Sequence, residues 1–145
     1  MRKIIFISFV IWIILLASGQ NLFACSCQVS LEPLKVQVKE AFNNSTAIFA
    51  GEVVSVTPKS EYEVAVKIKV GKSWKGAFFK EVTITTAKDS AMCGYGFEVG
   101  KTYLIYASGA DDNLMTTNCS RTTIVSDKQD IKFLNKLNRR KVKSG

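Results

Sequence analysis

Four cysteines constrain the fold of this chain more than any other feature. They all follow a segment with the pattern of a leader for export, so they are expected to meet an oxidising compartment. They stand at positions 25, 27, 93 and 119. An even number of cysteines in an exported chain predicts disulfide bonds. A bond between Cys25 and Cys27 would close a very tight ring with poor geometry. We therefore expect two disulfides that each join this CxC segment to a distant part of the chain, in one of two pairings.

A zinc ion bound by all four cysteines is the alternative to two disulfides. Structural sites of that kind favour paired CxxC segments, whereas this sequence has one CxC and two single, distant cysteines. We therefore favour the disulfides. Either long-range pairing would stabilise the chain by on the order of a few kcal/mol for each bond, and would make the amino terminus rigid.

The first 24 residues have the layout of a secretory signal peptide. Two early cations precede an apolar run from Ile4 to Ala17, which is too short for a comfortable membrane span. A polar stretch then ends at Ala24, and cleavage there would leave Cys25 as the first residue. Two other outcomes stay open, namely cleavage after Gly19 and lipidation of Cys25 as in bacterial lipoproteins.

The mature chain, residues 25–145, is long enough for one compact domain and too short for two. The whole sequence has 20 basic and 12 acidic side chains, and loss of the two cations in the leader leaves 18 against 12. This excess favours acidic or anionic partners, although a soluble surface rich in lysine is the simpler interpretation. We expect a secreted, periplasmic or extracellular monomer that stays free of the membrane unless Cys25 is lipidated.

The sequence contains no histidine, which excludes several classes of catalytic site. No serine–histidine–aspartate triad, cysteine–histidine pair or imidazole-bound zinc site can form. The acidic residues fall in strand-like alternation or in loops and offer no distinctive pair of carboxylates. We therefore predict that the protein is not an enzyme and uses no cofactor.

Hydrophobic periodicity predicts a helix near each end of the mature chain, over residues 32–46 and 127–141. Ser126 and Gln129 are spaced as an N-terminal capping box for the second helix. The apolar positions with helical spacing are Leu34, Val38, Ala41 and Phe42 in the first helix and Ile131, Leu134 and Leu137 in the second.

Between the helices the apolar period changes to two, which predicts antiparallel strands. A short turn at 58–61 joins the first two strands as a hairpin, and residues 72–76 read as a bend. The expected strands are 46–57, 62–70, 80–86, 102–108 and 113–118. An all-β core of five strands with flanking helices suggests a closed OB-fold barrel, although the pattern alone does not exclude a sandwich.

Five segments spread over nearly the whole mature chain carry a resemblance to a known module. They are CSC at 25–27, FAGEVVSV at 49–56, SWKG at 73–76, CGYGFEVGKTYLIYA at 93–107 and NLMTTNCSRT at 113–122. In this order they resemble the netrin-like module, most closely the amino-terminal domain of the tissue inhibitors of metalloproteinases. The resemblance implies a five-stranded OB-type barrel with packed helices. It also implies that Cys25 is bonded to Cys93 and Cys27 to Cys119.

The resemblance further implies a mechanism of inhibition. In that family a terminal ridge enters the cleft of a zinc metalloprotease, and the amino nitrogen and carbonyl oxygen of the first cysteine bind the catalytic zinc. An α-amine, with a pKa of about 7.7 to 8.0, loses its proton readily enough to act as such a ligand. Carried over by position, the residues that contact the protease are Cys25, Ser26, Cys27, Met92 and Cys93. Cys25 would be the main-chain zinc ligand, and Ser26 would enter the primary specificity pocket.

Two functional hypotheses from different classes follow. The first is a secreted inhibitor of zinc metalloproteases. The second is a netrin-like binding module of the cell envelope that inhibits no protease, with the cysteines as structural staples and a possible lipid anchor at Cys25. A nucleic-acid partner is not expected, because Phe97, Tyr103 and Tyr106 fit the core of a small barrel better than a base-stacking face.

Overall fold

The computed structural model describes residues 25–76, 80–126 and 128–143, with side chains up to 137 in the last segment. The leader expected at 1–24 lies outside the described residues. In chain order the elements are α2 (Leu34–Asn44), β1 (Ala47–Pro58), β2 (Glu63–Lys75), β3 (Glu81–Ala87), the 3-10 helix η1 (Ser90–Met92), β4 (Thr102–Ala110), β5 (Asn113–Met115), β6 (Thr123–Ile124) and α3 (Gln129–Lys143). Among the described residues, no helix has both the length and the apolar character that a membrane span requires.

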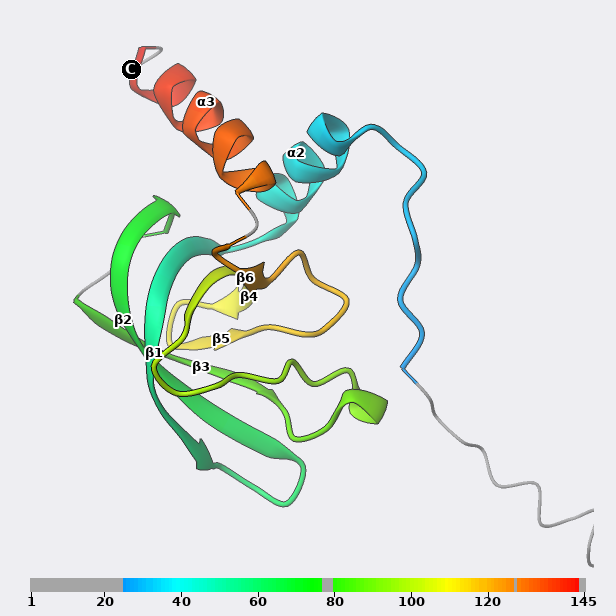
Figure 1. Cartoon of the computed structure of the whole chain (residues 1–145), viewed down its shortest axis with the longest axis vertical. Coiled ribbons are helices and arrows are strands. Elements are labelled where there is room, and N and C mark those ends of the chain that lie inside the picture. The colour runs from blue at the N-terminus through cyan, green and yellow to red at the C-terminus, as the bar shows by residue number, and fades with distance from the viewer. Residues whose placement is uncertain (1–24, 77–79, 127, 144–145) are drawn as a thin grey trace, which may run out of the picture.

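The strands close into one barrel, which β1 completes by pairing with both β2 and β4. The order around the sheet is β1-β2-β3-β5-β4-β6. Figure 1 shows α2 and α3 together at one end of this barrel. The expectation of an all-β core with flanking helices is confirmed, and the barrel is OB-like. Closure leaves few unpaired strand edges, which protects a small β-protein from edge-to-edge association.

Strand β4 is buried on both faces and therefore connects two hydrophobic clusters. Tyr103, Ile105 and Ala107 point into the barrel, where they pack with side chains of the other strands. Leu104 and Tyr106, on the opposite face, pack against the two helices. The helices contribute the inward residues expected from their periodicity, with Val38, Phe42 and Leu134 buried. The second cluster thus fixes α2 and α3 to the outside of the barrel.

The bend expected at 72–76 is wrong, because β2 continues through Lys75. Trp74 is 6% exposed and belongs to the cluster beneath the helices. Its indole Nε1 donates a hydrogen bond to Asn135 Oδ1 at 2.8 Å. The strand also pairs with β1 as far as Ile48 opposite Lys75. Tertiary packing of one tryptophan therefore keeps the segment extended where its local sequence suggests a bend.

Three further differences concern the strands after β2. Strand β6 was not expected, and β3 and β5 pair in parallel, with Thr85 opposite Met115, so the barrel is mixed rather than wholly antiparallel. Strand β5 also ends at Met115 instead of residue 118. It ends early because the following loop turns toward the cysteines, where the Asn118 nitrogen donates to the Cys93 carbonyl oxygen at 2.9 Å.

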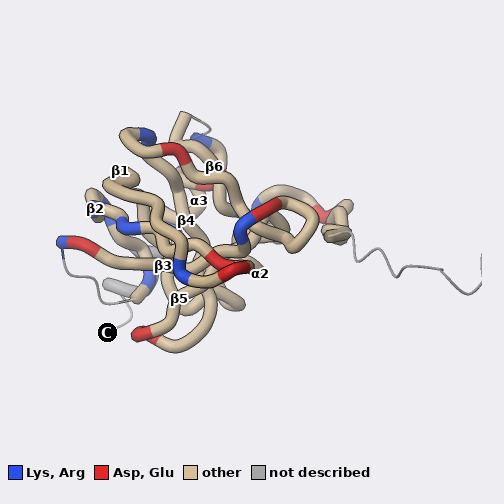
Figure 2. Tube along the Cα trace, turned by 90° about the horizontal axis from the view of Figure 1, so that it is seen from below, with Lys and Arg blue, Asp and Glu red and all other residues tan. Residues whose placement is uncertain are grey.

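Helix α3 begins at Gln129, two residues after the expected start at 127. The capping box expected at Ser126 and Gln129 spans residue 127, which lies outside the described residues. The chain just before Ser126 is still attached to the barrel, since the Val125 nitrogen donates to the Thr102 carbonyl oxygen at 3.0 Å. The helix can therefore start only after this turn. Figure 2 marks the charged positions along the chain. Among the strands, the basic side chains all lie on β2, which carries four lysines and one glutamate, whereas β1 and β3 each carry a single glutamate.

Candidate functional site

One side of the barrel carries a ridge built from three segments that are distant in sequence. They are residues 25–27, 90–93 and 118–119, and we call them the terminal ridge. Figure 1 shows the extended segment that precedes α2 running along the side of the molecule toward η1. The ridge contains every residue that sequence analysis placed in contact with a protease.

Two disulfides join the amino-terminal part of the ridge to the barrel. They are Cys25–Cys93 and Cys27–Cys119, which span 68 and 92 residues of sequence. This pairing is the one that the resemblance implies. The disulfides also touch each other, because Cys25 Sγ lies 3.5 Å from Cys119 Sγ. The start of the described chain is thus fastened at two adjacent points.

The 90–93 part of the ridge is held by hydrogen bonds of its own. Asp89 caps η1 by accepting from the Met92 nitrogen at 3.1 Å. The Cys93 nitrogen donates to the Ser90 carbonyl oxygen at 3.1 Å. Cys93 has a φ of 63°, a left-handed conformation that is uncommon for a residue with a side chain. These bonds direct the Cys93 sulfur toward the amino-terminal segment.

Gly94 lets the chain turn closely against the barrel directly after Cys93. A Cβ atom at this position would lie 2.1 Å from the Ala87 carbonyl oxygen and 2.6 Å from that of Asp89. The Gly94 nitrogen donates to the Asp89 oxygen at 2.8 Å. Only glycine allows this approach, so the position of Cys93 depends on its neighbour.

The main chain of Cys25 is fixed, and the side chains beside it reach solvent. The Cys25 nitrogen donates to the Ala91 carbonyl oxygen at 2.9 Å. Ser26 is exposed, and Met92 is 39% exposed. A rigid backbone with small or flexible side chains on its flanks is suited to insertion into a cleft.

Beyond the cysteines the chain continues as an arm, residues 28–33, that leads to α2. Val29 and Leu31 are 82% and 98% exposed, so the arm is not part of the core. The side-chain amide of Gln37 ties it to α2 by donating to the carbonyl oxygens of Glu32 at 2.6 Å and Ser30 at 3.3 Å. The arm is thus held by the disulfides at one end and by a single glutamine near the other.

A partly buried polar cluster lies between the arm and the helices. Arg121 donates to both carboxylate oxygens of Asp130, at 2.7 and 2.6 Å, and to Gln37 Oε1 at 2.8 Å. The Tyr106 hydroxyl donates to Asp130 at 2.9 Å. Hydrogen bonding to Asp130 raises the pKa of Arg121, and burial followed by the nearby Asp130 charge raises the pKa of Tyr106. The cluster connects α2, β4, α3 and the loop after Cys119.

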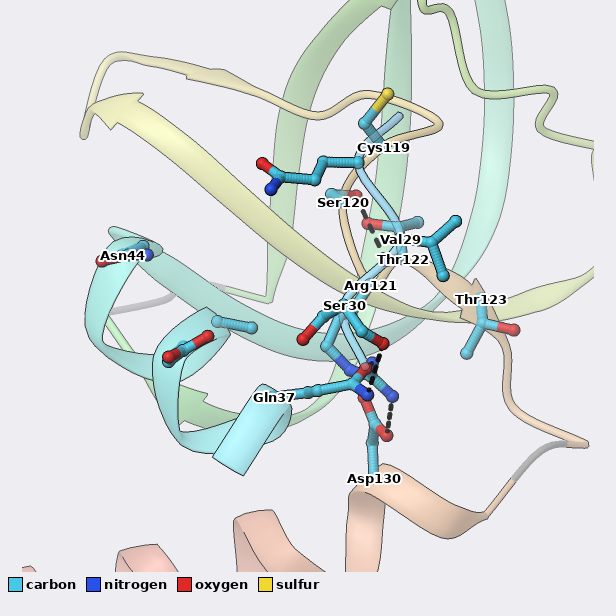
Figure 3. A pocket seen from close by; sticks show the side chains of 13 residues that line it. Val29, Ser30, Gln37, Asn44, Cys119, Ser120, Arg121, Thr122, Thr123 and Asp130 are labelled. Carbon is cyan, nitrogen blue, oxygen red and sulfur yellow. Dashed lines mark hydrogen bonds and ion pairs between the residues drawn. The ribbon is translucent and has the colours of Figure 1, made fainter. Parts of the chain in front are cut away.

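A cleft of about 680 Å³ lies beside the terminal ridge, lined by residues of the arm, α2, the loop 119–123 and Asp130. Figure 3 shows the Arg121 guanidinium between Gln37 and Asp130 in this cleft, with the dashed lines joining them. The charges of Arg121 and Asp130 compensate each other in this cleft, because the two side chains form an ion pair. Its residues support the position of the arm.

Sequence analysis did not identify Gln37, Arg121 and Asp130 as contributors to this region. One local signal was present, because Asp130 precedes Leu134 by four residues and therefore falls on the apolar face of α3. A carboxylate on a buried face requires a partner. The partner itself, Arg121, follows Cys119 by two residues and becomes apparent only in the folded chain.

The sequence matches no model of a known protein family, and no curated protein is significantly similar to it. The interpretation of the terminal ridge therefore rests on its own geometry and on the motif resemblance.

Proposed function

We propose that the protein is a secreted, non-enzymatic inhibitor of zinc metalloproteases, and that the main-chain nitrogen and oxygen of Cys25 bind the catalytic zinc of the target. The observation that carries this proposal is the fixation of Cys25 by its disulfide to Cys93 and by its hydrogen bond to Ala91. Donor atoms that are already in place lose little conformational entropy on docking.

The Cys25 nitrogen becomes a metal donor only after the leader has been removed. In the uncleaved chain its lone pair is delocalised into the peptide bond. After cleavage behind Ala24 it would be an α-amine with a pKa of about 7.7 to 8.0, whose neutral form has a free lone pair. One of its protons can keep the hydrogen bond to Ala91, which would hold the lone pair in a fixed direction. Export processing would thus also activate the inhibitor.

The chemistry of the target follows from what this ridge can offer. A catalytic zinc keeps an open position that normally holds water, and a nitrogen and an oxygen from one residue can displace that water. Ser26 is small and exposed, so it suits the entrance of a specificity pocket next to the metal. Met92 is flexible and apolar, and it would pack against the rim of the cleft.

The proposal is tested first on the exported protein as isolated from its source. Intact mass and terminal sequencing are expected to give Cys25 as the first residue, with its α-amine unmodified and its sulfur in a disulfide. The same preparation is expected to inhibit at least one member of a broad panel of zinc metalloproteases. An acyl group on Cys25, a first residue at Gln20, or no inhibition across the panel would contradict the proposal and favour a netrin-like binding module of the envelope.

A further inference from the structure

The sulfur atoms of the two disulfides form one cluster on the terminal ridge. The Sγ atoms of Cys25, Cys27 and Cys119 all lie within 4.8 Å of one another, and the Cys93 sulfur is bonded to Cys25. In a tetrahedral zinc site with four thiolates, Zn–S bonds of about 2.3 Å place the sulfurs about 3.8 Å apart. The spacing between the two disulfides, 3.5 Å from Cys25 to Cys119, is close to that value.

The cluster consists of two halves that the chain positions separately. The barrel supplies Cys93 and Cys119, whose backbones are linked because the Asn118 nitrogen donates to the Cys93 carbonyl oxygen at 2.9 Å. This link is a main-chain hydrogen bond and involves no sulfur atom. The CxC segment supplies the other two sulfurs, and the Cys25 hydrogen bond to Ala91 places it beside the barrel. Reduction would therefore leave a pair of thiols on the barrel and a pair on the adjoining segment.

Asn118 is a second, independent feature that points to this cluster. Its side-chain oxygen lies 3.3 Å from Cys25 Sγ, 3.5 Å from Cys119 Sγ and 3.7 Å from Cys27 Sγ. As an oxygen it can accept from thiols. The amide nitrogen now donates to the Ser90 carbonyl oxygen at 3.3 Å. If the amide turns by 180° and gives up this bond, its nitrogen can donate to thiolates instead. Hydrogen bonds of this kind orient metal ligands and tune their basicity.

We propose that the reduced protein binds one thiophilic metal ion such as Zn²⁺ through the thiolates of Cys25, Cys27, Cys93 and Cys119. Asn118 acts as a positioning residue for these ligands. Each disulfide accepts two electrons and two protons from a dithiol reductant, which becomes a disulfide, and the four thiols then lose their protons as they bind the metal. The metal and the disulfides would be alternative ways to fasten the same ridge. This inference does not rest on inhibition of any protease.

The experiment uses the full exported chain, reduced with a phosphine under anaerobic conditions and titrated with Zn²⁺ alone. The phosphine takes up oxygen from water to become its oxide, while each disulfide becomes two thiols. The reduced protein is expected to bind one Zn²⁺ per chain and the oxidised protein none. Substitution of Zn²⁺ by Co²⁺ should give the absorption of a tetrahedral site with four thiolates. Zn²⁺ should also raise the melting temperature of the reduced protein, or refold it if reduction alone unfolds it.

Two variants separate a built site from non-specific binding by thiols. Cys119→Ser, reduced, is expected to bind Zn²⁺ at least about 100-fold more weakly, because one thiolate is lost. Asn118→Ala should weaken binding by about 10-fold, whereas Thr117→Ala, one residue earlier and exposed, should not change it. The proposal would be overturned if the reduced chain bound Zn²⁺ equally tightly with and without denaturant, or if Zn²⁺ did not raise its melting temperature. In either case the fold would contribute nothing to the site.

Discussion

The backbone nitrogen of Cys25 donates a hydrogen bond to the carbonyl oxygen of Ala91 at 2.9 Å, and this contact places the expected first residue of the mature chain against η1. The disulfide to Cys93, two residues after Ala91, fixes the same residue through its side chain. The position of Cys25 therefore depends on how the barrel holds the segment from Asp89 to Gly94. Changes at Asp89 or Gly94, which flank the ridge residues 90–93, should disturb the ridge without replacing any of its residues.

Replacement of Gly94 by alanine tests this dependence. The added Cβ would lie 2.1 Å from the Ala87 carbonyl oxygen, so the backbone must shift, and we expect the free energy of unfolding to fall by about 2 to 3 kcal/mol. Gly96→Ala is the matched control, because its Cβ would meet nothing within 4 Å. Urea denaturation of both variants measures the difference. Equal stability of the two would contradict the close approach described at Gly94.

Replacement of Asp130 by alanine tests the polar cluster that supports the arm. It leaves the Arg121 guanidinium and the Tyr106 hydroxyl without their shared acceptor, and we expect a loss of about 3 kcal/mol. This is the lower end for a buried pair, because the Arg121 side chain keeps 28% exposure. Glu81→Ala removes the exposed partner of Lys67 and should cost less than about 1 kcal/mol. Chemical denaturation checks both, and similar losses would show that the cluster contributes little.

The raised pKa of Tyr106 predicts a loss of stability at high pH. The unfolded chain releases the phenolic proton above its ordinary value of 10.0, while burial and Asp130 make the folded chain retain it. The stabilisation is therefore complete below pH 10 and falls above it, by about 1.4 kcal/mol for each pH unit. Tyr106→Phe should show a shallower fall over the same range. Denaturation midpoints of both proteins between pH 9 and 11 measure this, and parallel curves would exclude a contribution from Tyr106.

Much of the barrel was predictable because its strands alternate between buried and exposed side chains. The parts that were not predictable depend on contacts between distant segments. Trp74 keeps β2 extended by packing under the helices, and β6 has only two residues and so carries no period of its own. The later start of α3, at Gln129, follows from the hydrogen bond that still attaches Val125 to Thr102.

The ridge could be predicted only in part for a similar reason. The cysteine spacing required long-range bonds, but their pairing came from the motif resemblance and not from the spacing itself. Arg121, Gln37 and Asp130 lie on three separate elements, so no local pattern could show that they meet. The contact between Cys25 Sγ and Cys119 Sγ likewise exists only in the folded chain.

The exposed side chain of Ser26 is expected to set which proteases are inhibited. Ser26→Leu fills more of a specificity pocket, so it should strengthen inhibition of proteases with deep pockets and weaken inhibition of those with shallow ones, by about 10-fold or more. Because Ser26 is exposed, its replacement should change the melting temperature little. Inhibition constants across the protease panel provide the test. A uniform change for every protease would place Ser26 outside the pocket.

The most direct test of the central claim compares two forms of the protein that differ by one residue. One begins at Cys25, and the other carries a single alanine ahead of it, which converts the amine into a peptide nitrogen and pushes extra atoms toward the zinc. Both should keep the two disulfides and the same melting curve. We predict that the inhibition constant rises at least about 100-fold in the extended form, which corresponds to about 2.7 kcal/mol of lost binding. Equal inhibition by two folded forms would contradict zinc binding by the Cys25 amine.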